Sequence, residues 1–190
     1  MAKELKDMTL EELWELFPIV LSSHAPLWAE WAKEEISILT TLLSDFDKTI
    51  THIGSTAIPG IMAKPIVDIL VEIPAETNKE DIIKIMEAAG YICMSVSDNR
   101  MSFNKGYTPN GCSEKVFHIH FHNIGDNDEI FFRDYLIANP DVAKEYERLK
   151  LSLLPKFKHN RDGYTQAKTT FVNCITALAK YESYQADKGT

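Results

Sequence analysis

The sequence is short of cysteine and of long apolar runs, and each shortage excludes a class of protein. Its three cysteines, Cys93, Cys112 and Cys174, are odd in number and widely spaced, so they form neither a CxxC pair nor a disulfide framework. No apolar run approaches the roughly 20 residues that a membrane-spanning helix needs. The charged, amphipathic N-terminus also lacks the pattern of a secretory signal. We therefore expect reduced thiols, no membrane partner and a cytoplasmic location.

Positive charge is also scarce. The chain has 20 Lys and Arg against 28 Asp and Glu, which gives a net charge of −8. Broad, sequence-independent binding to nucleic acids needs clustered Lys and Arg, so this composition argues against it. The balance still allows a small nucleotide that is held in a locally basic pocket.

The 190 residues are enough for one domain with a sizeable core. Periodicity, capping and turn signals predict strands at 49–53, 66–73, 91–96, 101–105 and 116–122. They predict helices at 9–17, 26–43, 79–89, 128–138, 139–155 and about 162–184, the third of them opened by a capping box at Thr77.

This order gives N-terminal helices in 1–48, a sheet core in 49–126 and C-terminal helices in 127–190. Strands that are confined to the middle of the chain favour an α+β domain with a small mixed sheet and a C-terminal helical layer.

The predicted strand 66–73 contains a carboxylate in an otherwise apolar run. A buried carboxylate is costly unless a cation or strong donors compensate it, so Asp68 is a candidate ligand or catalyst. Because side chains alternate faces along a strand, Asp68 shares its face with Leu70 and Glu72. Residues four apart on a strand are separated by ~13 Å, so we expect Glu72 to be a solvated strand end rather than a partner of Asp68. The small-residue turn Gly54–Ser55 before it resembles a phosphate seat.

Three histidines, His118, His120 and His122, alternate with apolar residues and therefore lie on one face of the predicted strand 116–122. Histidine is a common metal ligand and a general acid or base near neutral pH. A half-exposed strand with a polar face is the plainer alternative. Neighbouring histidines could meet at one ion, whereas His118 and His122 could do so only with a strong twist.

A third group of candidates is basic. Its members lie near turns or in helices that could close over the sheet, and Arg and Lys suit contacts with phosphate. Individually each is more often a surface charge. They are Lys64, Arg100, Lys105, Arg133 and Lys168.

Several of these segments, taken in order, resemble the GrpB family. They are the run HIGSTAIPGIMAKPIVDILVEI, the strand FHIHFH, and the tail FRDYLIANPDVAKEYERLKLSLL followed by YTQAKTTFV. The resemblance extends from about His24 to the last helix. That family is grouped with the nucleotidyltransferase superfamily and is fused to dephospho-CoA kinase in some proteins. The resemblance implies a nucleotidyltransferase-like core with added helices.

The resemblance also assigns roles. In the superfamily pattern a Gly-Ser turn positions nucleotide phosphates and acidic residues on two strands bind metal. Here Asp68 matches the first acid, Leu70 stands at the second, and His118 and His120 occupy the strand that would carry the third. The implied catalytic and metal-binding residues are Asp68, His118 and His120, with Mg²⁺ or Mn²⁺ expected and Zn²⁺ as an alternative. The implied nucleotide-binding residues are Gly54, Ser55, Thr56, Lys64, Arg133 and Lys168.

Three functions follow as hypotheses. The first is metal-dependent transfer of a nucleotidyl group from a nucleoside triphosphate, or another small nucleotide, to an unknown small acceptor. The second is a nucleotide-binding or regulatory module without catalysis, which the missing acid at Leu70 favours. The third is a histidine-triad-like nucleotide hydrolase with His120 as nucleophile, although Asn123 interrupts the apolar pair expected after the third histidine.

Overall fold

The computed structural model describes residues 3–188. The expected domain 1–190 thus includes residues 1, 2, 189 and 190, which lie outside the described part. The strands are β1 (Thr49–Ile53), β2 (Val67–Ile73), β3 (Ile92–Val96), β4 (Arg100–Thr108) and β5 (Gly111–Asn123). The helices are η1 (Leu5–Asp7), α1 (Leu10–Leu16), α2 (Leu27–Leu42), η2 (Ser55–Ala57), α3 (Lys79–Ala88), α4 (Asp128–Ala138), α5 (Pro140–Phe157) and α6 (Arg161–Lys188).

The five strands form one mixed sheet in the order β1-β2-β5-β4-β3. Only β2 and β5 pair in parallel, and the other neighbours are antiparallel. The α+β class with a small mixed sheet, predicted from the sequence, is confirmed. The parallel pair lies in the interior of the sheet, so the two strands that carry Asp68 and the histidines are direct neighbours.

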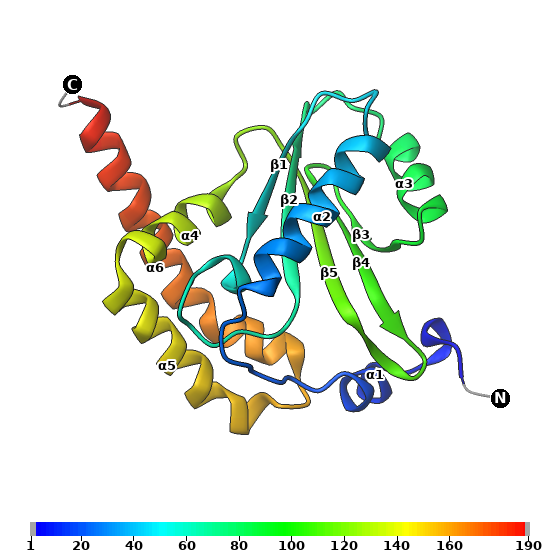
Figure 1. Ribbon diagram of the computed structural model, residues 1–190, viewed down its shortest axis with the longest axis horizontal. Helices are drawn as coiled ribbons and strands as arrows, with labels where there is room; N and C mark the ends of the chain where they lie inside the picture. Colours follow the sequence, from blue (N-terminus) through cyan, green and yellow to red (C-terminus); the bar gives the residue numbers. More distant parts are fainter. Residues whose placement is uncertain (1–2, 189–190) are drawn as a thin grey trace.

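One face of the sheet is largely apolar and forms the main core. Alternate residues of β2, from Val67 to Ile73, are buried together with Phe117, Ile119 and Phe121 of β5. Trp28 of α2 belongs to the same core, together with residues of α3. Figure 1 shows α2 and α3 on this side of the sheet. The alternation that places these apolar residues in the core turns Asp68 and the histidines to the opposite face.

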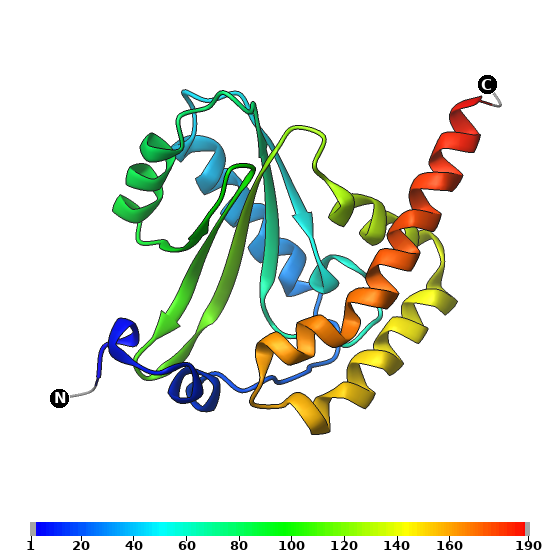
Figure 2. The ribbon, with the colours of Figure 1, turned by 180° about the vertical axis from the view of Figure 1, so that it is seen from behind.

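The C-terminal helices α4, α5 and α6 pack against one another beside that opposite face, as the view from behind shows (Figure 2). Their small apolar cluster includes Phe132 of α4 and Tyr146 of α5, and it also takes in Ile58 and Ile61 of the loop after η2. The site between sheet and helices is therefore enclosed by segments from both halves of the chain.

Several predicted boundaries were wrong. The hairpin β4–β5 is longer than strands 101–105 and 116–122, because the ladder continues past a bulge near Lys105 to a tight turn at Thr108. Pro155 lies inside α5 near its end, where the loss of one backbone donor does not stop the helix before Phe157. The cap of α3 is Asn78 rather than Thr77, since the Asn78 side chain accepts from the backbone N–H of Glu80 at 3.1 Å.

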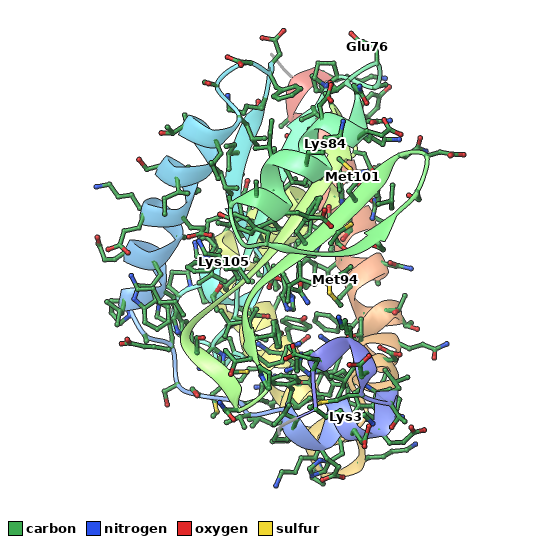
Figure 3. All side chains as sticks on the ribbon, turned by 90° about the vertical axis from the view of Figure 1, so that its right-hand side faces the viewer. Lys3, Glu76, Lys84, Met94, Met101 and Lys105 are labelled. Atoms are coloured by element: carbon green, nitrogen blue, oxygen red, sulfur yellow. The ribbon has the colours of Figure 1, made fainter. Side chains whose placement is uncertain are left out.

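The prediction that Glu72 is a solvated strand end was also wrong. Glu72 is only 7% exposed, and its Oε1 accepts hydrogen bonds from the backbone N–H of Gly125 at 3.0 Å and from Asn127 Nδ2 at 3.1 Å. The loop after β5 folds back over this end of the strand, which covers the carboxylate. Glu76, in the following loop, is the exposed carboxylate of this region (Figure 3).

Across residues 3–188, no helix is both long enough and apolar enough to cross a membrane.

Candidate functional site

The site is built by the register of β2 and β5. The parallel ladder pairs Asp68 with His118 and Leu70 with His120, so the carboxylate lies beside two imidazoles on one face. Asp68 Oδ1 is 3.4 Å from His118 Nδ1 and 3.2 Å from His120 Nε2. The three ligand atoms all lie within 4.8 Å of one another, close enough to share one metal ion.

The charges of this cluster suit a cation. Burial raises the pKa of Asp68, but hydrogen bonds with His118 and His120 outweigh that effect and hold the pKa below its usual value. Burial lowers the pKa of His118, and the attraction of Asp68 only partly offsets this. Near pH 7 the cluster therefore combines a carboxylate with a neutral His118, which leaves an imidazole lone pair to bind metal.

The turn between β1 and η2 packs directly against Asp68. Gly54 has φ +72° and ψ −172°, a conformation that essentially only glycine adopts. A Cβ at Gly54 would lie 2.6 Å from Asp68 Oδ2 and 3.0 Å from the Cβ of Asp68. Glycine is therefore required twice here, for the backbone shape and for the close approach to the carboxylate.

Neighbouring side chains support this turn. Thr56 is buried, and its hydroxyl lies 3.0 Å from His52 Nε2. Burial lowers the pKa of His52 to about 4, so this ring is neutral and can take part in that hydrogen bond in either sense. Burial raises the pKa of Tyr146 to about 12, although a side-chain hydrogen bond with Ser55 opposes the change.

A cavity of about 580 Å³ opens between the sheet and the C-terminal helices. Its lining includes the Asp68 cluster, the Gly54–Ser55 turn, and four basic side chains from the loop before β2, from α5 and from α6. The four are Lys64, Lys150, Arg161 and Lys168.

Burial and mutual repulsion lower the pKa values of three lysines in the basic wall of the cavity. Lys150 is only 2% exposed, and burial followed by repulsion from Lys168 lowers its pKa to about 7. Burial and then repulsion from Lys64 lower the pKa of Lys168 to about 8. Burial also lowers the pKa of Lys64, in part against the attraction of Asp68. A bound anion would relieve this repulsion, so the wall is a favourable place for phosphate.

The structure brings seven of the predicted site residues to this cavity and leaves others outside its lining. Present are Asp68, His118, His120, Gly54, Ser55, Lys64 and, from α6, Lys168. Arg133 lies instead against β1, where its Nη1 donates to the carbonyl of His52 at 2.6 Å, and it also pairs with Asp134. Thr56 is likewise outside the lining and bonds to His52.

Other candidates have partners elsewhere. Lys105 Nζ pairs with Oε1 of Glu35, a buried residue of α2, at 2.8 Å. Arg100 lines the cavity, but it is held by Asp126 at 2.6 Å. His122 is 4% exposed and is hydrogen-bonded through Nδ1 to the carbonyl of Asp126 at 2.7 Å, so it does not join the other two histidines.

Sequence reasoning missed Lys150, Arg161, Tyr107 and His52. Lys150 sits in an amphipathic helix among other charges, where it looks like a surface lysine. Arg161 and Tyr107 reach the site only through tertiary contacts. His52 carried a usable signal, because it precedes the Gly-Ser turn by two residues in the same predicted strand.

With this geometry in view, the comparisons with known proteins identify the family. The GrpB protein family matches residues 18–178, and the chain belongs to it. The glutamate-rich protein GrpB of Alkalihalophilus pseudofirmus is 38% identical over 164 residues, which cover 83% of this chain and 93% of that protein. The family predicted from the sequence is thereby confirmed.

Solved structures agree. The crystal structure of GrpB from Enterococcus faecalis is similar at a TM-score of 0.72 and 28% identity, covering 87% of this chain and 99% of that chain. The MgGTP-bound Cid1 poly(U) polymerase is similar at a TM-score of 0.49 and 12% identity, covering 75% of this chain and 44% of that chain. The second likeness is too loose to carry an argument about activity.

The close approach of Gly54 to Asp68 generates a prediction. We expect Gly54→Ala to reduce the free energy of unfolding by more than the ~1–3 kcal/mol that a strained backbone alone costs, because the new Cβ would also meet the carboxylate. Gly60→Ala is the matched control, since Gly60 has φ +76° and open space around it. Urea unfolding of both variants measures the difference. Equal losses would contradict the close contact at Gly54.

Proposed function

We propose that this member of the GrpB family binds a nucleoside triphosphate with a divalent ion and transfers its nucleotidyl group to a small acceptor. The observation that supports this most is the meeting of two features in one cavity. Asp68, His118 and His120 can share an ion, and a wall of four basic side chains lines the same space. Phosphoryl chemistry needs both, because an ion and cations must neutralise the charge of the phosphates.

The residues present fit a divalent ion through one carboxylate oxygen and two imidazole nitrogens. Mg²⁺ or Mn²⁺ is the expectation from the superfamily, with Zn²⁺ as the alternative. When bound, such an ion supplies Lewis-acid polarisation of a phosphoryl oxygen. Asp68 and the two histidines would hold the ion, and the Asp68 carboxylate would offset part of its charge.

The remaining residues orient the nucleotide. The backbone of Gly54 and the hydroxyl of Ser55 meet the phosphates, and Lys64 and Lys168 neutralise them from the other side of the cavity. Thr56 and Arg133 act through His52, because they bond to its side chain and to its carbonyl and so keep the Gly-Ser turn in place. The three free cysteines support a cytoplasmic setting for this reaction.

A second candidate function is nucleotide binding without catalysis, in a regulatory module. Leu70 favours it, because this side chain is 0% exposed at the position where the superfamily carries a second acid. A centre with one carboxylate neutralises less charge than one with several, which weakens the case for turnover but not for binding.

Replacement of Asp68 tests both functions, and pyrophosphate release by the wild type distinguishes between them. We expect Asp68→Asn to abolish metal-dependent binding of triphosphates, because the amide removes the charge that holds the ion. Calorimetric titration with ATP, GTP, CTP and UTP, each with Mg²⁺, Mn²⁺ or Zn²⁺, measures binding, and release of pyrophosphate measures transfer.

Asp98→Asn, in the exposed turn before β4, is the matched control and should behave as the wild type. Binding and turnover by Asp68→Asn at wild-type levels would contradict both functions. Tight binding by the wild type without pyrophosphate release would favour the non-catalytic module.

The lowered pKa of Lys168 predicts a pH dependence. The protonated lysine binds phosphate, so affinity should be full below about pH 8 and should fall as the pH rises above that value. Between pH 7.5 and 9.5 the phosphates themselves stay fully ionised, since the second phosphate pKa is about 6. Titration of the wild type with a triphosphate over this range measures the fall.

Two variants test whether Lys168 causes the fall in triphosphate affinity above about pH 8. We expect Lys168→Arg to remove most of the fall, because arginine stays protonated throughout, and Lys168→Gln to bind about tenfold more weakly at pH 7.5. Lys84→Gln, an exposed lysine on α3 (Figure 3), should match the wild type. An unchanged pH profile in Lys168→Arg would rule Lys168 out as its source.

A further inference from the structure

Both ring nitrogens of His118 have a polar neighbour. Its Nδ1 lies 3.4 Å from Asp68 Oδ1, and its Nε2 is hydrogen-bonded to the hydroxyl of Tyr107 on β4 at 2.7 Å. The Tyr107 ring also stacks on His118, with centroids 5.8 Å apart and an interplanar angle of 17°. The imidazole is therefore fixed in orientation before any ligand arrives.

Tyr107 is itself held in place by Arg161, the first residue of α6. Arg161 Nη1 donates to the Tyr107 hydroxyl at 3.0 Å, and its Nε donates to the carbonyl of Phe17 at 3.0 Å. The Phe17 ring completes the arrangement, edge-on to Tyr107 with centroids 4.9 Å apart. Phe17, which precedes α2, thus contacts both Arg161 and Tyr107. Through these two side chains, which do not touch the Asp68 carboxylate, it supports the position of His118.

We propose that Tyr107 and Arg161 are positioning residues that aim His118 Nδ1 at a metal ion, and that the Asp68–His118–His120 centre prefers one Zn²⁺-class ion over Mg²⁺. The inference rests on the proposed function for its use of the ion, but not for the metal binding itself.

The positioning role follows from the protonation of imidazole. For Nδ1 to offer a lone pair, the ring must be neutral and carry its proton on Nε2, where an acceptor must receive it. A tyrosine hydroxyl can be that acceptor, because the Arg161 donation occupies one lone pair of its oxygen and leaves the other.

The choice of ion follows from the donor set. Two imidazole nitrogens and one carboxylate suit Zn²⁺ and similar borderline ions. Mg²⁺ prefers oxygen ligands in an octahedron and gives up its waters reluctantly. With Leu70 in place of a second acid, this face of β2 offers no further carboxylate next to Asp68 to favour Mg²⁺.

The test uses the full chain without nucleotide. Metal-free protein is titrated with Co²⁺, whose visible absorption reports its ligands, and Zn²⁺ or Mg²⁺ is then added as competitor. We expect Zn²⁺ to displace Co²⁺ and a large excess of Mg²⁺ to leave it bound. We expect Tyr107→Phe to bind Co²⁺ about 10–100-fold more weakly and with an altered spectrum, as loss of a supporting hydrogen bond to a metal ligand does.

Tyr181→Phe makes the same chemical change at an exposed position on α6 and should match the wild type. Mg²⁺ that competes as well as Zn²⁺, or an unchanged Co²⁺ affinity in Tyr107→Phe, would overturn the inference. Nitrogen-15 NMR of His118 in the Zn²⁺-loaded wild type gives a second measurement that needs no variant. A proton on Nε2 is expected, and a proton on Nδ1 would overturn the positioning role.

Separate titration of the metal-loaded protein with triphosphates keeps the two proposals apart. Metal binding as described without nucleotide binding would overturn the proposed function and leave the metal centre standing. Nucleotide binding that needs only Mg²⁺ and ignores Tyr107→Phe would overturn the inference and leave the function standing.

Discussion

The parallel pairing of β2 with β5 is the contact on which the rest of the site depends. It sets Asp68 opposite His118 and, through the two-residue period of a strand, keeps His120 on the same face. A slip by one residue would turn the carboxylate toward the apolar core, where it would be costly to bury. The apolar residues on the other face of the same strands, from Val67 to Phe121, therefore hold the register that the site needs.

The cavity of an acidic protein is lined by five basic and four acidic side chains, and most of the basic ones come from three converging segments. The net charge is −8, yet four basic side chains gather around one space because α5, α6 and the loop before β2 converge there. Burial, and then repulsion from a neighbouring lysine, lowers the pKa values of Lys150 and Lys168. An anion bound at this wall would relieve the repulsion.

Local periodicity explains what the sequence could predict and what it could not. Alternation along β2 and β5 predicted that Asp68 and the histidines share a face, and glycine at position 54 predicted the turn. Lys150 and Arg161 could not be found in this way, since a helix pattern does not tell which exposed charge meets a sheet. Glu72 was misjudged for the same reason, because the loop that covers it is distant in sequence. The same loop keeps His122 apart from the other two histidines, because His122 is hydrogen-bonded to the carbonyl of Asp126 in that loop.

A crystal structure with a non-hydrolysable triphosphate and a divalent ion tests the central claim most directly. The account requires the ion between Asp68, His118 and His120, with the phosphates between Ser55 and the wall formed by Lys64, Lys150, Arg161 and Lys168. A triphosphate bound elsewhere, or bound in this cavity without an ion at Asp68, would contradict it.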